Sequence, residues 1–115
     1  MITDAGKNKT ADLIVGNFLY IAVGDGGDDT ATSQTTLDHE IARKEADSKQ
    51  VIGNTIVYTV TFTGDEITTN VISEMGVFNH ATTGNGDMLT RVNFNSIGPL
   101  ASNETVSFTF RVVIP

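Results

Sequence analysis

The chain has 115 residues, of which 39% are hydrophobic, and an excess of acidic residues gives it a formal net charge of −7. This length and composition fit a single globular domain over residues 1–115, and the acidic balance argues against nucleic acid or a membrane surface as a partner, because both attract clustered Lys and Arg. The absence of cysteine excludes disulfides and thiolate chemistry.

The first predicted element is a short helix over residues 3–15. Thr3 can cap it, because its hydroxyl accepts a hydrogen bond from an amide of the first turn, and Asp4 suits the positive end of the helix dipole. Gly16 follows at the place where a left-handed C-cap residue is expected. Gly6 weakens the helix, so we expect it to depend on packing against a sheet.

The middle of the chain is predicted to hold strands and one long loop. Residues 17–23 form the first strand, whose apolar run is too short to span a bilayer. Residues 24–33 are rich in Gly, Asp and Thr, which is typical of a loop. Good helix formers favour a helix over 38–47. The turn at 53–54 instead favours a strand over 40–52 that pairs with the next one, and we expect this strand.

Alternation of apolar and polar residues marks the strands of the C-terminal half, predicted at 55–63, 70–79, 88–94 and 104–114. Gly76 indicates a bulge or a close approach of another segment. Turns at 64–65 and 82–87 join neighbouring strands, which implies antiparallel pairing. These about six to seven strands predict a mainly β protein, an antiparallel β-sandwich or open barrel with one N-terminal helix.

The last strand alternates most cleanly. One face is apolar and the other is polar, with Ser107, Thr109 and Arg111. The apolar face holds Val106, Phe108, Phe110, Val112 and Ile114.

An acidic group in the long loop is the strongest candidate for a metal site. Asp25, Asp28 and Asp29 could bind Ca²⁺ through carboxylate oxygens, but their spacing lacks the alternating ligands of an EF-hand. Asx turns in a solvated, glycine-rich loop explain the same residues. We expect this second role, and therefore no metal and no cofactor.

The two histidines, His39 and His80, are far apart in the sequence and lack the spacing of a helical metal motif. Asp38 and Glu40 flank the first of them and could add ligands. We expect both histidines to be surface residues at strand ends.

Catalytic groups are not indicated either. No serine has the context of an activated nucleophile, and we expect Ser73 and Glu74 to form a solvent-facing pair. Glu45, Glu66 and Glu74 could supply paired carboxylates for glycoside cleavage, but nothing in the sequence brings them together. We expect no catalytic residue and no enzymatic activity.

Short motifs follow one another in a specific order: IAVG at 21–24 before a small-residue loop, EIAR at 40–43, EMGVFN at 74–79 and MLTRVNF at 88–94. Their order resembles that of small structural proteins of tailed viruses, of the tail-fibre or baseplate-associated type, over nearly the whole chain. Such proteins often carry Pro, Ala and Thr where this loop carries its three aspartates. The resemblance implies a phage virion component, in the tail rather than the capsid, made in the host cytoplasm.

The resemblance also implies partners, namely further copies of the chain, with trimers common in fibres, and other virion proteins. Edge strands of a small sandwich are covered when copies pair, which agrees with this expectation. We expect the helix, the loop at 24–38 and the polar face of the last strand to contact neighbouring subunits. A capsid decoration protein and a receptor- or carbohydrate-binding module at a tail tip remain alternatives.

Overall fold

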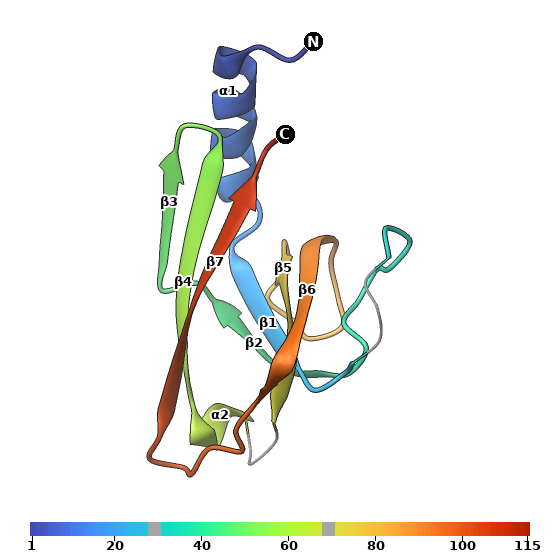
Figure 1. Cartoon of the computed structure of the whole chain (residues 1–115), viewed down its shortest axis with the longest axis vertical. Coiled ribbons are helices and arrows are strands. Elements are labelled where there is room, and N and C mark those ends of the chain that lie inside the picture. The colour runs from blue at the N-terminus through green and yellow to red at the C-terminus, as the bar shows by residue number, and fades with distance from the viewer. Residues whose placement is uncertain (28–30, 68–70) are drawn as a thin grey trace.

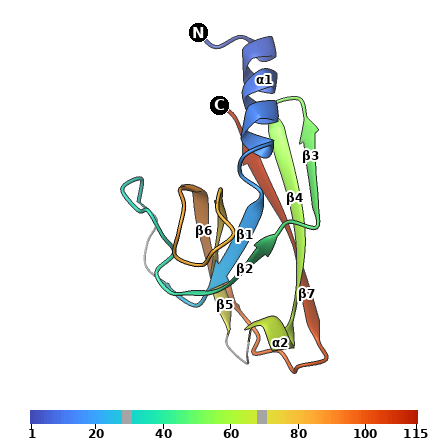
Figure 2. The same ribbon diagram turned by 180° about the vertical axis from the view of Figure 1, so that it is seen from behind.

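The computed structural model describes residues 1–27, 31–67 and 71–115. Over these residues the protein is mainly β, with seven antiparallel strands in two open sheets, sandwich-like in arrangement, and an N-terminal helix (Figures 1 and 2). The predicted antiparallel sandwich with one N-terminal helix is confirmed. Within the described residues, neither helix has the length and apolar character that a membrane span needs.

The elements, in chain order, are α1 (Asp4–Val15), β1 (Tyr20–Gly24), β2 (Glu40–Glu45), β3 (Ser48–Ile52), β4 (Thr55–Thr63), α2 (Gly64–Ile67), β5 (Ile72–Phe78), β6 (Met88–Ile97) and β7 (Thr105–Val113). The four-stranded sheet has the order β2-β1-β5-β6, and the three-stranded sheet has the order β3-β4-β7. Both termini lie at the α1 end of the molecule (Figure 1).

The helix α1 begins as its capping signal predicts. The Thr3 hydroxyl accepts a hydrogen bond from the Gly6 amide at 3.1 Å, and Asp4 stands in the first turn. Ala11 is fully buried, and the helix packs on β3 and β4. The helix therefore rests on the three-stranded sheet, as expected from its weak helical propensity.

The end of α1 differs from the prediction. Gly16 has φ −75°, so it is right-handed and not a left-handed cap. The Asn17 side chain instead donates to the Leu13 carbonyl at 2.8 Å, and the Phe18 amide donates to the Ile14 carbonyl at 2.8 Å. These bonds satisfy the last carbonyls of the helix, and they delay the start of β1 by three residues relative to the predicted strand.

The segment 40–52 is neither one strand nor a helix, because it crosses between the sheets. The Ala46 amide donates to the Leu19 carbonyl at 2.9 Å beside β1, whereas the next amide, of Asp47, donates to the Thr59 carbonyl at 2.8 Å in β4. The chain therefore leaves one sheet and enters the other at this step. Only its second half, β3, pairs with the next strand as predicted.

Two other boundaries change. The predicted turn at 64–65 is the short helix α2, in which Thr63 and Glu66 cap each other: the Thr63 amide donates to the Glu66 carboxylate at 2.8 Å, and the Glu66 amide donates to the Thr63 hydroxyl at 3.3 Å. The strand predicted at 88–94 continues to Ile97.

Of the two alternatives predicted for Gly76 in β5, the structure shows the close approach of neighbouring segments. A Cβ there would lie 3.1 Å from the Leu37 side chain and 3.1 Å from the Thr90 carbonyl, so neighbouring segments approach closely. The register with β6 also shifts between Val77 and Phe78. Glycine is the residue that allows this close contact.

The main core lies between the two sheets. The alternating face of β4 supplies four side chains that are at most 2% exposed: Ile56, Tyr58, Val60 and Phe62. All residues of β5 are buried, because both faces of the four-stranded sheet are covered at this strand. We call the face that is turned away from the three-stranded sheet the far face. A smaller cluster of Ala22, Leu37 and Phe78 lies there, with Met88 against it.

Tyr58 makes the core sensitive to alkaline pH. Its hydroxyl donates to the Phe18 carbonyl at 2.8 Å, and burial raises the pKa of Tyr58 to about 12. Since this value lies above the ordinary 10, the unfolded chain ionises first, and stability is lost as pH rises from 10 towards 12. At pH 11 we expect Tyr58 to account for a loss of about 1.4 kcal/mol in the free energy of unfolding.

Urea denaturation at pH 8 and pH 11 checks this. The Tyr58→Phe variant should be less stable at pH 8 by about 1 kcal/mol, because the Phe18 carbonyl loses its donor, but it should lose less stability than the wild type at pH 11. Tyr20→Phe is the control and should keep the alkaline loss. An identical loss in Tyr58→Phe and wild type would contradict the assignment.

Candidate functional site

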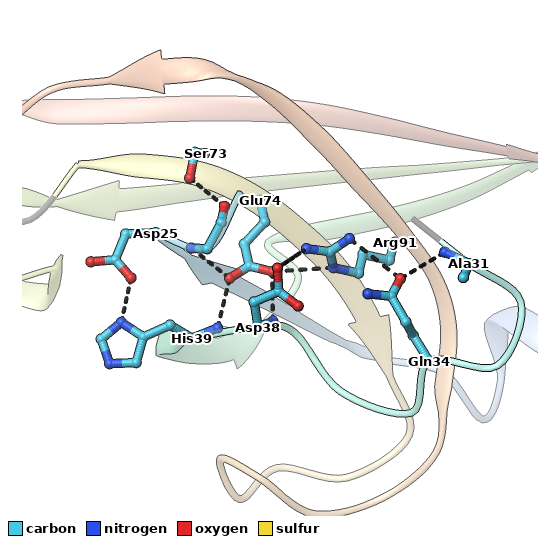
Figure 3. Close-up of polar contacts among 9 residues, drawn as sticks. Asp25, Ala31, Gln34, Asp38, His39, Ser73, Glu74 and Arg91 are labelled. Atoms are coloured by element: carbon cyan, nitrogen blue, oxygen red, sulfur yellow. Dashed lines mark hydrogen bonds and ion pairs between the residues drawn. The ribbon is translucent and has the colours of Figure 1, made fainter. Parts of the chain in front are cut away.

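A buried carboxylate organises the far face of the four-stranded sheet (Figure 3). Glu74 on β5 is fully buried, and its carboxylate contacts residues near both ends of the long loop between β1 and β2. One of its oxygens accepts the amides of Gly26 and His39, at 2.8 and 2.9 Å, and the other accepts the amide of Asp38 at 2.9 Å. These three bonds tie both ends of the long loop to the middle of the sheet.

Arg91 on the neighbouring strand β6 completes this cluster. Its guanidinium donates to Glu74 at 2.8 and 3.1 Å and to the Asp38 carboxylate at 3.1 Å. A longer contact of 3.4 Å reaches the Gln34 side chain, which in turn accepts the Ala31 amide at 2.9 Å. The cluster therefore spans β5, β6 and the loop.

The surroundings keep Glu74 ionised. Burial by itself raises the pKa of a carboxyl group, but the amides of His39 and Asp38, the Arg91 guanidinium and the Gly26 amide outweigh it, and they hold the pKa of Glu74 below its ordinary value. Both oxygens are occupied by fixed donors. We interpret Glu74 as a structural anchor of the loop.

The prediction that Ser73 and Glu74 face solvent is wrong. Ser73 is 8% exposed and donates to the Gly26 carbonyl at 2.6 Å. Both residues lie on a strand in the interior of the sheet, where the register with β6 shifts between Ile72 and Glu74, and they bind Gly26, Asp38 and His39 instead of water. Figure 3 shows the two side chains directed at the loop.

The acidic group of the loop is only partly described. The carboxylate of Asp25 is within hydrogen-bonding distance of the Nδ1 atom of His39, whose side chain is mostly exposed. Asp28 and Asp29 lie outside the described residues. Among the residues that are described, no three His, Asp or Glu side chains gather closely enough to hold a metal.

Both histidines lie at strand ends, as predicted. His39 immediately precedes β2, and exposed His80 follows β5. The flanking residue Glu40 pairs with Arg43 at 2.8 Å, and Asp38 binds Arg91, so neither joins His39 as a ligand.

The three glutamates considered for glycoside cleavage engage different cations. Glu45 pairs with Lys49 at 3.1 Å, Glu66 with Lys44 at 3.0 Å, and Glu74 with Arg91 at 2.8 Å. Lys44 and Lys49 therefore bind carboxylates, as Arg43 does with Glu40, and these three basic residues do not form a basic patch.

Arg43 anchors the hairpin loop between β5 and β6. Its fully buried guanidinium stacks on the Phe78 ring at 3.8 Å from the centroid. It donates to the carbonyls of His80 and Asn85 at 3.0 and 2.7 Å. Two buried arginines thus hold loops on the far face of the four-stranded sheet. Arg91 binds the loop between β1 and β2, and Arg43 binds the loop between β5 and β6.

An apolar groove opens between the two sheets at β6 and β7. It has a volume of about 410 Å³ and is lined chiefly by Met75, Val92, Phe94, Ile97, Phe108 and Phe110. The ring centroids of Phe94 and Phe108, which both line it, are 6.0 Å apart. A second hollow of about 400 Å³ shares residues with it, and Arg91 and Arg111 belong to its lining.

The groove exists because β6 and β7 do not pair. They follow each other in the chain, yet β6 ends the four-stranded sheet and β7 ends the three-stranded sheet (Figures 1 and 2). Sequence reasoning missed the groove, since alternation identifies apolar faces but not which face lacks a partner. Val92, which is 40% exposed, shows that the main core is incompletely covered here.

No protein-family model matches the chain, and no curated protein sequence does either. The fold and the groove define the class of protein: a small, open, sandwich-like β protein with fixed loops on one face and an uncovered apolar strip between two sheet edges. An apolar strip between free strand edges is typical of a surface that binds another polypeptide.

Proposed function

We propose that the protein is a non-enzymatic structural component of a tailed-virus virion, of the tail-fibre or baseplate type, that assembles as a symmetric homo-oligomer and contacts other virion proteins. The observation that carries the proposal is the uncovered groove between β6 and β7. Oligomerisation is the usual way to cover such a surface and the strand edges beside it.

The motifs that carry the family resemblance support the same reading. They coincide with the strands of the four-stranded sheet: EIAR lies on β2, IAVG on β1, EMGVFN on β5 and MLTRVNF on β6. Their charged residues include Arg43, Glu74 and Arg91, which fix the covering loops. The resemblance therefore concerns a scaffold that presents loops and edges, in agreement with a role in assembly.

The surface of α1 adds a second contact region. Leu13 on α1 is 61% exposed, and Ile2, which precedes the helix, is 60% exposed; Ile52 at the end of β3 and Val113 at the end of β7 are exposed as well. Exposed apolar side chains of this size favour contact with a neighbouring protein.

Light scattering coupled to size-exclusion chromatography tests self-assembly. We expect a mass that is a multiple of the 12.3 kDa chain. Detection of the protein in purified tails, but not in separated capsids, tests its place. A strict monomer at high concentration that is absent from tails would contradict the proposal, whereas recovery in capsids would favour a decoration protein.

A further inference from the structure

The free edges of the two sheets differ in how well they are protected against pairing. Natural edge strands are kept from pairing by short length, bulges, charged residues or proline. β3 has only five residues, β2 carries four charged residues and a register shift, and β6 has two register shifts against its neighbour.

The remaining edge, β7, is the least protected of the four. It spans nine residues, Thr105–Val113, and pairs with β4 along its whole length without a register shift. It contains no proline and one charged residue, Arg111. Its outer edge therefore presents a regular row of backbone donors and acceptors that suits an added strand.

We propose that β7 pairs antiparallel with β7 of a second copy of this chain, across a two-fold axis at Thr109. This inference rests on the proposed self-assembly and names the surface that carries it. The pairing joins two three-stranded sheets into one continuous sheet.

The sequence of β7 is complementary to itself in this register. Antiparallel pairing about Thr109 keeps the apolar faces together and places Phe108 opposite the second copy's Phe110, an aromatic pair that stabilises neighbouring strands. It also places Arg111 opposite Ser107 of the second copy, so the two arginines do not face each other. No carboxylate lies on β7, although the chain carries a net charge of −7. The edge itself therefore adds no repulsion between carboxylates when two copies pair.

The groove also favours a second copy of the chain as the partner of β7. The apolar side chains of an added β7 point to the side on which Phe94, Phe108 and Phe110 lie half-buried, and they extend the cover over this strip. Its polar residues remain on the outer face, where Ser107, Thr109 and Arg111 are exposed. A strand with this alternation fits the edge and the groove at once.

Disulfide cross-linking tests the pairing, because the chain contains no cysteine of its own. Under mild oxidation we expect Thr109→Cys to form a covalent dimer on a non-reducing gel, since the two cysteines face each other across the axis. Ser48→Cys is a closely matched control. Ser48 and Thr109 are both exposed and both pair with Thr59, but Ser48 lies on the opposite edge of the sheet. Equal cross-linking of both variants would overturn the proposal.

A charge on the axis gives a second, independent measurement. Thr109→Lys places two like charges opposite each other, and we expect the dissociation constant of the assembly to rise at least about tenfold, while Thr109→Ser leaves it unchanged. Circular dichroism confirms that each variant is folded. A wild-type monomer would overturn self-assembly altogether. An oligomer that keeps its mass in Thr109→Lys, or one with an odd number of copies, would overturn only the β7 pairing.

Discussion

Replacing Glu74 with Gln is expected to lower the free energy of unfolding by about 3–5 kcal/mol, the usual cost of removing one member of a buried ion pair. The variant removes the buried carboxylate that pairs with the Arg91 guanidinium at 2.8 Å, so that Arg91 keeps its ion pair with Asp38 but loses the fully buried partner. It also turns an amide group with its own N–H donors towards three backbone amides that need acceptors. Urea denaturation at pH 7 measures the loss.

The control for this prediction is Glu45→Gln. Glu45 is exposed and pairs with Lys49 four residues away, so its replacement should cost about 0.5 kcal/mol or less. A similar loss in both variants would mean that the buried cluster contributes no more than a surface ion pair.

Acid provides a second readout of the same site. Because the pKa of Glu74 is held below its ordinary value in the folded protein, its contribution is present at neutral pH and disappears as pH falls through the folded pKa. We expect the Glu74→Gln variant to lose less stability than the wild type between pH 7 and pH 3. Parallel pH profiles would argue against an ionised anchor.

Local alternation predicted much of the architecture. In β4 and β7 the apolar positions face the core and the polar ones face outward, as the period of two requires. The Thr3 cap placed the start of α1 equally well. These features depend on neighbouring residues only, which is why they can be read from the chain.

The candidate site was much harder to predict, because it depends on distant segments. Glu74 bonds to Gly26 and His39, which lie 48 and 35 positions away in the sequence. The residues next to Glu74 give no indication that these distant amides are its partners. One signal was present: β5 is apolar at positions on both of its faces, which is typical of a strand buried on two sides. A carboxylate in such a strand needs a buried partner.

The step of the chain from one sheet to the other at residues 46–47 was not predicted, for a related reason. The residues on either side of it are both suited to strands, and the change of sheet is decided by which carbonyl each amide meets, Leu19 or Thr59. The helix α2 could have been predicted, because Thr63 and Glu66 have the spacing of a capping box. The sequence interpretation took the same residues as a turn.

These differences bear on function. The far face of the four-stranded sheet, where sequence reasoning placed an exposed pair, is closed by Glu74, Arg91 and Arg43. The uncovered apolar surface lies instead between β6 and β7. We therefore expect contacts between copies to involve this edge in addition to the helix and the loop.

Truncating Phe62 to Ala is expected to destabilise the protein by about 3–5 kcal/mol, the cost of a large cavity in a closed core. Phe62 is 1% exposed on β4, pairs with Val106 on β7, and lies beneath the Lys44 ammonium group at 5.4 Å. The surrounding sheets cannot close the space that its ring leaves. Denaturation in urea at low protein concentration measures the loss for the single chain.

Phe110→Ala is the comparison that connects stability with assembly. Its ring is half-buried at the groove, so its removal should cost the single chain only about 1–2 kcal/mol, while it removes the aromatic pair expected between copies. We therefore expect Phe110→Ala to lower the mass observed by light scattering at a concentration where Phe62→Ala, if folded, still assembles. The reverse order, with a large loss of stability in Phe110→Ala and an unchanged mass, would make the groove a part of the core and not a contact surface.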